Sequence, residues 1–414
     1  MKLEKYSFGL GDRFGQQANA LLRAIIEINE KGVPVVPVWN KSYREHVIVG
    51  TSPEDVRFTA DNAVSSLNWT GNYYVDADHI NHENVDPFIG PSNYFTIDVS
   101  KFIGQSIRQE DIRKFVNKYT THFRRANILN ISKNSENSLT TFYKIASKYL
   151  LAIKQAGKIY RHIESIKGKH NFITEISIDE TDTPQSPMEM FLILIAIADQ
   201  GIPIQTIAPK FVGRFNKGVD YQGNIQQFAI AFENHLILIK YMIKEFGLPK
   251  NLKLSIHSGS DKFSIYGIMK SKIEKHDAGL HVKTAGTTWL EELIGLACTD
   301  EKGLSLVKEI CLSGLDRLEE LIEPYWNVIN ISKERLPHPD EIYSWSGEEF
   351  ANSLRHNISN PKYNSDLRQL LHLGFKVAAE MKNHYIDSIK NFENSIAENV
   401  SENILKNHLN PLFL

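Results

Sequence analysis

Eight short runs of strand-forming residues, spaced over the first 285 residues, constrain the fold of this chain more than any other feature. The runs are Tyr6–Gly11, Pro34–Trp39, Tyr73–His79, Tyr94–Val99, Ile173–Asp179, Ile204–Phe211, Leu252–Phe263 and Leu280–Ala285. Most gaps between them are long enough for a helix, and Gln16–Lys31 carries apolar residues at helical spacing. Strands that alternate with helices indicate a parallel sheet, and eight of them favour a (β/α)8 TIM-type barrel over an open doubly wound sheet.

Two parts of the chain do not belong to a minimal barrel. A charged, helix-patterned stretch separates the fourth run from the fifth, and from Glu291 onward the pattern is helical. We therefore expect a single barrel domain over residues 1–414. It would carry a helical insertion at about 105–170 and a helical C-terminal cap at about 300–414.

Composition excludes several classes of function. The chain is 42% hydrophobic, so it can form a sizeable core. Its net charge is −2, so it lacks the positive charge with which proteins bind nucleic acid or a membrane surface. Cys298 and Cys311 lack metal-ligand spacing and are expected to be reduced thiols. No apolar run approaches the length of a membrane span. We expect a cytoplasmic protein that binds a small-molecule substrate, and the sequence leaves open whether it forms a homo-oligomer.

Charged and polar residues gather where the runs end. They are Asp12, Arg13, Asn40, Lys41, Asp76, Asp78, His79, Asp98, Glu175, Asp179, Glu180, Asp182, Lys210, Arg214, His257, Asp261, Lys262, His281 and Lys283. In a parallel barrel the carboxyl ends of all strands meet at one mouth. Convergence of so many charges there indicates an enzyme that acts on a small polar anion.

The third run, YYVDADH, carries one of two histidine motifs. Asp76 and Asp78 share a strand face, and His79 follows directly. A carboxylate beside a histidine serves well as a base next to a metal ligand. The alternative is an aspartate that caps the following helix.

The seventh run, LKLSIHSGSDKF, carries the second histidine motif. His257 lies on the polar face just before a Ser-Gly-Ser turn, and Asp261 and Lys262 follow. We interpret His257 as a candidate metal ligand, although a strand histidine is often only a hydrogen-bonded core residue.

The fifth run has a polar face of Glu175, Ser177 and Asp179. Such a face is costly to bury, so a metal ion, bound water or ion pairs must satisfy it. His372, on a helix of the C-terminal region, is assigned a structural hydrogen bond in preference to a role in the site.

Four cations are candidates for binding a substrate carboxylate: Lys210, Arg214, Lys262 and Lys283. Arg214 could bind it through two parallel hydrogen bonds. A salt-bridge network at the barrel mouth is the alternative for each of them.

The Asp78-His79 pair and His257 before its Gly/Ser turn together resemble the class II metal-dependent fructose- and tagatose-bisphosphate aldolases. In that family an Asp-His pair ends the third strand, the aspartate as base and the histidine as metal ligand, and a second ligand histidine precedes a turn at the seventh strand. The resemblance implies a divalent cation (Zn, Mn, Ni, Co or Fe) on His79 and His257.

The sequence departs from those aldolases at the sixth run. The family takes a further metal histidine there, and IQTIAPKF contains none. Under this resemblance the third ligand must come from His281, Glu175 or Glu180.

Over most of its length the chain resembles the tagaturonate epimerase family more closely. The stretches that carry this resemblance are YSFGLGDRFGQQ, PVWNKSYREH, VDADHI, TEISIDETDTPQSP, APKFVGRFNKGVDY, HSGSDKFSIY, HVKTAGTTWLE and DLRQLLHL. One departure is Gln16-Gln17, where a His-Gln pair would be usual. The resemblance implies interconversion of tagaturonate and fructuronate, in which galacturonate breakdown joins the glucuronate route.

We hypothesise a retro-aldol mechanism in which Asp78 removes the hydroxyl proton and Glu180 acts as the acid on the opposite side. Lys210, Arg214 and Lys283 would hold the substrate carboxylate. Two alternatives remain at this point: a class II-type aldolase that releases its fragments from a keto sugar acid or sugar phosphate, and a non-enzymatic uronate-binding regulatory protein.

Overall fold

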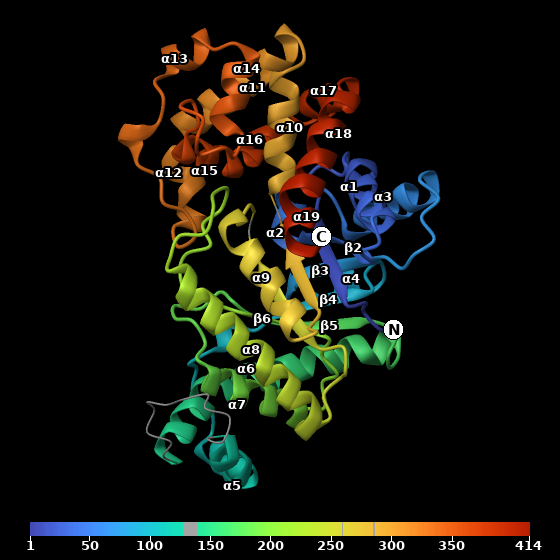
Figure 1. Ribbon diagram of the computed structural model, residues 1–414, viewed down its shortest axis with the longest axis vertical. Helices are drawn as coiled ribbons and strands as arrows, with labels where there is room; N and C mark the ends of the chain where they lie inside the picture. Colours follow the sequence, from blue (N-terminus) through green and yellow to red (C-terminus); the bar gives the residue numbers. More distant parts are fainter. Residues whose placement is uncertain (127–138, 259, 285) are drawn as a thin grey trace.

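A closed barrel of eight parallel strands forms the centre of the molecule, in a computed structural model that describes residues 1–126, 139–258, 260–284 and 286–414 (Figure 1). The strands are β1 Tyr6–Gly11, β2 Val35–Ser42, β3 Tyr74–Ile80, β4 Tyr94–Asp98, β5 Ile173–Ile178, β6 Thr206–Pro209, β7 Lys253–His257 and β8 Leu280–Lys283. Each strand pairs in parallel with the next, and β1 pairs with β8. The predicted (β/α)8 barrel is confirmed, and the open doubly wound sheet is excluded.

Helices surround the barrel, and their sequences explain where they begin and pack. They are α1 Ala18–Glu30, α2 Tyr43–Val49, α3 Pro53–Ser66, α4 Asp86–Ile89, α6 Leu139–Lys167, α7 Pro187–Asp199, α8 Ile225–Phe246, α9 Phe263–Lys275 and α10 Thr287–Ala297. In α1 the buried Leu21, Ile25 and Ile28 recur at helical spacing on one face, and α1 packs on β2. Ser42 and Ser186 form capping boxes that start α2 and α7.

Between β4 and β5 the chain forms a 3-10 turn (η1, Ser100–Phe102), α5 (Gln109–Ala126) and α6. Helices α5 and α6 fall in the stretch at about 105–170 where the sequence predicts a helical insertion, and residues 127–138 of that stretch lie outside the described residues. Helix α6 packs against α5, α7 and β4.

The residues after α10 form a helical layer over one end of the barrel. Its elements are α11 Glu301–Asp316, α12 Leu318–Ile322, η3 Glu323–Tyr325, η4 Lys333–Arg335, α13 Pro339–Ser344, α14 Gly347–Leu354, α15 Ser365–Leu373 and α16 Phe375–Glu380. This layer is drawn in orange to red-brown at the top of Figure 1 and is called the cap below. None of the described helices is long and apolar enough to cross a membrane.

The last elements return to the side of the barrel. They are α17 Asn383–Asn391, α18 Glu393–Glu402, a π-helix Asn403–Leu409 (η5) and α19 Asn410–Phe413. Helix α18 packs against α1 and α10, and α19 packs against α9 (Figure 1). The C-terminal helices therefore cover the first and the last helices of the barrel proper.

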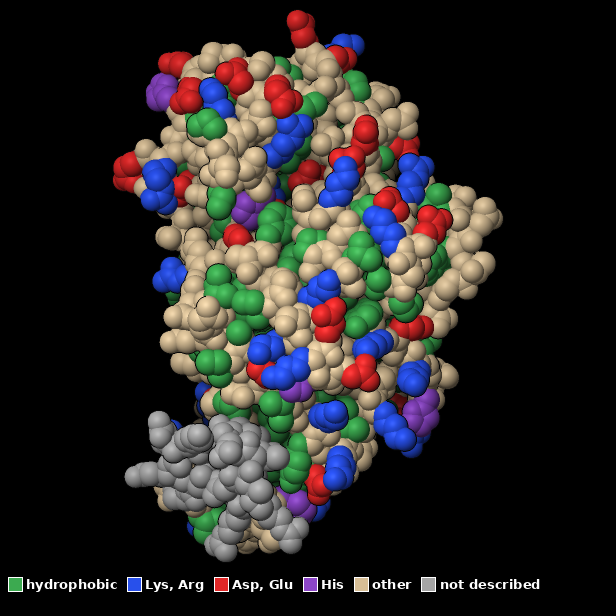
Figure 2. Space-filling model, viewed as in Figure 1, with side chains coloured by type: hydrophobic (Ala, Val, Ile, Leu, Met, Phe, Trp, Pro, Cys, Tyr) green, Lys and Arg blue, Asp and Glu red, His purple; other side chains and the backbone are tan. Residues whose placement is uncertain are grey.

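The interior of the barrel is polar, whereas barrel interiors are usually filled by branched aliphatic side chains. Ser7, Ser255 and His281 form one register row across β1, β8 and β7, and all three are buried. Tyr94 and Glu175 lie in the same interior and are buried as well. On the outer surface, in contrast, side chains of both charge signs are intermixed over the face drawn in Figure 2.

Candidate active site at the carboxyl ends of the strands

His79 is positioned by an irregular end of β3. The register between β3 and β4 shifts between Ala77 and Ile80, and His79 has a φ of 52° in the left-handed region. That conformation is strained for a side-chain-bearing residue and is found preferentially at functional sites. The His79 Nδ1 atom lies 3.2 Å from Asp98 Oδ2, at the end of β4.

His257, the last residue of β7, faces His79 across the mouth. The two imidazole centroids are 5.1 Å apart in an edge-to-face arrangement. His257 Nδ1 lies 3.1 Å from Asp179 Oδ2, and its Nε2 lies 2.8 Å from Glu175 Oε1. Both carboxylates come from β5 or the residue just after it.

The groups at this point fit a divalent cation. His79, Asp179 and His257 each offer one donor atom, and these atoms lie within 4.8 Å of one another. His79, Asp98 and Glu180 form a second group of possible metal ligands, and their donor atoms also lie within 4.8 Å of one another. Two imidazoles and a carboxylate form a donor set typical of catalytic zinc and of non-haem iron.

Electrostatics agree with this fit. Burial lowers the pKa of His257, but the Asp179 and Glu175 carboxylates outweigh burial and raise it to about 9. Burial also lowers the pKa of His79, but the Asp78 and Asp98 carboxylates outweigh burial and raise it well above its ordinary value. Carboxylates that stabilise positive charge on an imidazole stabilise a metal cation in the same place.

Lys283, at the end of β8, neutralises three carboxylates below the two histidines. Its Nζ lies 2.7 Å from Asp76 Oδ2, 2.9 Å from Asp78 Oδ1 and 3.0 Å from Glu175 Oε1. Burial raises the pKa of Asp76 to about 6, whereas Lys283, against the effect of burial, holds the pKa of Asp78 at about 2. Asp78 is therefore ionised at neutral pH.

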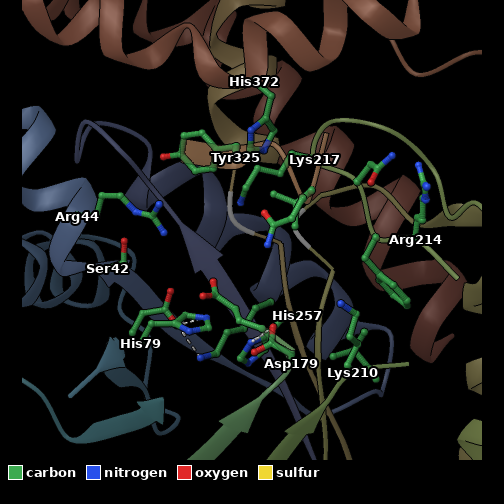
Figure 3. A pocket seen from close by; sticks show the side chains of 18 of the residues that line it. Ser42, Arg44, His79, Asp179, Lys210, Arg214, Lys217, His257, Tyr325 and His372 are labelled. Atoms are coloured by element: carbon green, nitrogen blue, oxygen red, sulfur yellow. Dashed lines mark hydrogen bonds and ion pairs between the residues drawn. The ribbon is translucent and has the colours of Figure 1, made fainter. Parts of the chain in front are cut away.

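A cavity of about 330 Å³ opens above these residues, between the strand ends and the cap (Figure 3). Its volume lies in the range of small-molecule sites. Seven of the site residues expected from the sequence line it: Asp78, His79, Glu180, Lys210, Arg214, His257 and Lys283.

The structure places the other three expected residues elsewhere. Glu175 lies behind His257 and does not line the cavity. His281 is the second residue of β8, near its amino end, where its Nδ1 lies 2.9 Å from Ser7 Oγ and burial lowers its pKa to about 3. Lys262 is buried, and its Nζ donates hydrogen bonds to backbone carbonyls.

Asp179 also lines the cavity; its place at the end of the fifth run put it among the charges expected at the mouth, although the sequence assigned it no role. Other lining residues were not expected. Arg44, Lys217 and Tyr325 come from α2, the loop after β6 and the cap, where no strand-end pattern marks them. His372, which the sequence assigned a structural role, lines the cavity from α15.

Comparison with known proteins gives consistent results. A sequence model of a family described as tagaturonate epimerase matches residues 1–412. A curated tagaturonate/fructuronate epimerase of Thermotoga maritima is 26% identical to this chain, over 98% of the chain and 80% of that protein.

Solved structures share the fold. A glycerol complex of the fructuronate-tagaturonate epimerase from Cohnella laeviribosi superposes with a TM-score of 0.79 at 24% identity, over 100% of this chain and 82% of that chain. A probable tagatose 6 phosphate kinase from Sinorhizobium meliloti superposes with a TM-score of 0.51 at 10% identity, over 99% of this chain and 100% of that chain. At these identities the superpositions establish a common architecture.

Proposed function

The chain belongs to the tagaturonate epimerase family, and from this we propose that it interconverts tagaturonate and fructuronate in the cavity between the barrel and the cap. One structural observation supports the proposal independently of the family match. His79, Asp179 and His257 form a group that fits a metal ion, and it lies beneath a cavity with cationic walls. A sugar acid needs both features, a site for its carboxylate and a site where charge on a carbonyl oxygen is stabilised.

The chemistry of the two sugar acids favours carbon–carbon bond cleavage. They differ at a hydroxyl-bearing carbon β to the ketone, and the carbonyl does not acidify the C–H bond there. Loss of the hydroxyl proton instead allows the bond between the α and β carbons to break. Its electron pair passes to the ketone fragment as an enediolate, and the β carbon becomes an aldehyde. If the aldehyde turns before the bond forms again and the oxygen regains its proton, the configuration at that carbon is inverted.

His79, Asp179 and His257 are the residues that would hold a divalent cation. When bound there, such a cation supplies Lewis-acid stabilisation of negative charge on the ketone oxygen. Zn, Mn, Ni, Co and Fe all accept imidazole and carboxylate ligands, so the donor set does not select among them.

Two carboxylates from different strands serve the proton transfers. Asp78, kept ionised by Lys283, takes the hydroxyl proton, and Glu180 is the acid on the other side of the substrate. Lys283 itself is surrounded by Asp76, Asp78 and Glu175, so its charge stabilises the carboxylates and is not directed to the substrate.

The test is conversion of tagaturonate by the purified protein with an added divalent cation, followed by nuclear magnetic resonance in deuterated water. We expect fructuronate without deuterium at the inverted carbon. Deuterium at that carbon would refute the retro-aldol route in favour of proton transfer. Absence of fructuronate with every metal of the series above would refute the epimerase function itself.

A further inference from the structure

Three cations gather around one aromatic ring at the boundary between the cap and the barrel. The Tyr325 ring, in the η3 turn of the cap, has Arg44 Cζ 5.1 Å from its centroid, Lys217 Nζ at 5.4 Å and Lys376 Nζ at 5.4 Å. Tyr325 is buried, so its ring is held in place by the surrounding packing. Cation–π contacts of this kind stabilise each cation in a defined position.

Two of the three cations face the cavity. Arg44 and Lys217 line it together with Tyr325, whereas Lys376 does not. Figure 3 shows Arg44 and Lys217 on either side of Tyr325, on the cap side of His79, His257 and Asp179. The group therefore lies across the cavity from the residues that fit a metal ion.

These two cations lack an anion. Among the described residues, no carboxylate lies within ion-pair distance of Arg44 or Lys217, whereas neighbouring Arg13 is paired with Glu45 at 3.2 Å. Burial, and then the charges of Arg13 and Arg44, lower the pKa of Lys217, and the Glu45 and Glu180 carboxylates oppose this only in part. Arg44 is exposed and Lys217 is half-buried. Like charges held close together repel each other, and a bound anion would remove that repulsion.

The other cations at the mouth are engaged or differently placed. Lys283 is neutralised by three carboxylates, and Lys262, which does not line the cavity, donates to the backbone carbonyls of Asn216 and Val219. Lys210 donates to the Thr181 carbonyl. Arg214 is exposed, as Arg44 is, but it lies on the side of the cavity opposite Arg44 in Figure 3, and among the described residues no aromatic ring lies in cation–π contact with it.

We propose that Arg44 and Lys217, fixed over the Tyr325 ring, form the subsite that binds the carboxylate of the substrate. This inference rests on the proposed function and adds the residues that make the enzyme specific for a sugar acid over a neutral ketose. The carboxylate lies on the far side of the inverting carbon from the ketone, so it remains with the aldehyde fragment after cleavage. The subsite therefore also retains that fragment while it turns.

Binding to chelator-treated protein, measured by calorimetry, separates this subsite from turnover. The probes are tagaturonate and tagatose, which differ only in a carboxylate against a hydroxymethyl group. We expect the wild-type protein to bind tagaturonate about 10-fold or more tightly than tagatose, because charged hydrogen bonds contribute on that scale. Arg44→Met and Lys217→Met should each remove most of that preference.

Lys376→Met is the matched control, since Lys376 touches the same ring from outside the cavity. It should bind both sugars as the wild-type protein does. A preference that survives in the Arg44→Met and Lys217→Met proteins, or that is lost in Arg214→Met instead, overturns the subsite.

Turnover provides the second arm of the test. Arg44→Met and Lys217→Met should raise the KM for tagaturonate more than they lower kcat, and should release free aldehyde fragment that the wild-type protein retains. If wild-type protein shows the binding preference but does not form fructuronate, the proposed function fails while the carboxylate subsite stands.

Discussion

At the scale of single residues, the position of each imidazole depends on a neighbouring carboxylate. His79 Nδ1 donates a hydrogen bond to the Asp98 carboxylate, and His257 Nδ1 donates one to the Asp179 carboxylate. These contacts fix the orientation of both rings before any metal arrives. Preorganisation of this kind reduces the free energy needed to assemble the site.

Asp179 and His281 differ in what their loss should do to metal binding. We expect Asp179→Asn to lower metal affinity by about 100-fold, because it removes a charged donor next to His79 and His257. His281→Asn should retain the metal, since His281 lies with Ser7 at the amino end of the strands. Metal content per folded chain, measured by mass spectrometry, checks both. Metal loss in His281→Asn with retention in Asp179→Asn would contradict the ligand set.

Lys283 should be essential for stability as well as for charge balance. Lys283→Met leaves three buried carboxylates without their cation, so we expect the free energy of unfolding to fall by about 3–5 kcal/mol. Denaturant titration measures the change. Lys101→Met, which removes an exposed pair with Glu83, should change stability by less than about 1 kcal/mol. Equal effects of the two substitutions would refute a special role for Lys283.

At the scale of elements, a buried ionic group helps to tie the cap to the barrel. Asp261, in the turn after β7, lies 2.5 Å from Arg368 Nη2 on α15, 3.0 Å from His356 Nδ1 and 3.2 Å from His408 Nε2. Arg368 is fully buried and also donates to the Gly218 carbonyl. Helix α15, which carries His372 into the cavity, is therefore positioned by the same loop that follows His257.

Helix α10 carries a carboxyl group that should make stability depend on pH. Burial raises the pKa of Glu291 from 4.5 to about 8, with a smaller opposing effect of Arg368. The folded state prefers the protonated form, so the unfavourable contribution is absent below pH 4.5, grows as the pH rises and levels off above about pH 8.

Glu291→Gln keeps an acceptor for Asn403 Nδ2 and removes this ionisation. We expect the variant to melt several degrees above the wild-type protein at pH 8 and at nearly the same temperature at pH 5. Thermal unfolding at the two pH values measures the difference. Glu398→Gln, at an exposed position of α18, should show no such pH dependence, and a similar shift there would contradict the assignment.

At the scale of the whole molecule, metal binding should stabilise the fold as well as support turnover. A chelator should abolish epimerisation and lower the melting temperature, and a divalent cation should restore both. The stabilisation is about 2.7 kcal/mol at a free metal concentration 100 times Kd. Full activity in a preparation free of metal by elemental analysis would refute metal dependence.

The barrel was predictable because its signals are local. Each run is a short stretch of strand-forming residues that can be recognised without the rest of the chain, and β1 begins and ends at the predicted residues, Tyr6–Gly11. The histidine that ends β7 was visible for the same reason. Arg44, Lys217 and Tyr325 were not, since they meet only after the cap has packed over the strand ends. His281 is the second residue both of the predicted run and of β8, so its place near the amino end of the strand could have been predicted from the sequence.

The return of α18 and α19 to the barrel has a consequence for synthesis of the chain. Helix α1 covers part of the first strands, yet its partner α18 begins at Glu393, near the other end of the sequence. While a ribosome makes the chain, the face of α1 that α18 will cover stays open to water and to other proteins until α18 has emerged. Contacts over such sequence separations slow folding and expose apolar surface meanwhile. Docking of α18 on α1 is therefore expected to be a late step in folding, and the apolar face of α1 is at risk of wrong contacts until then.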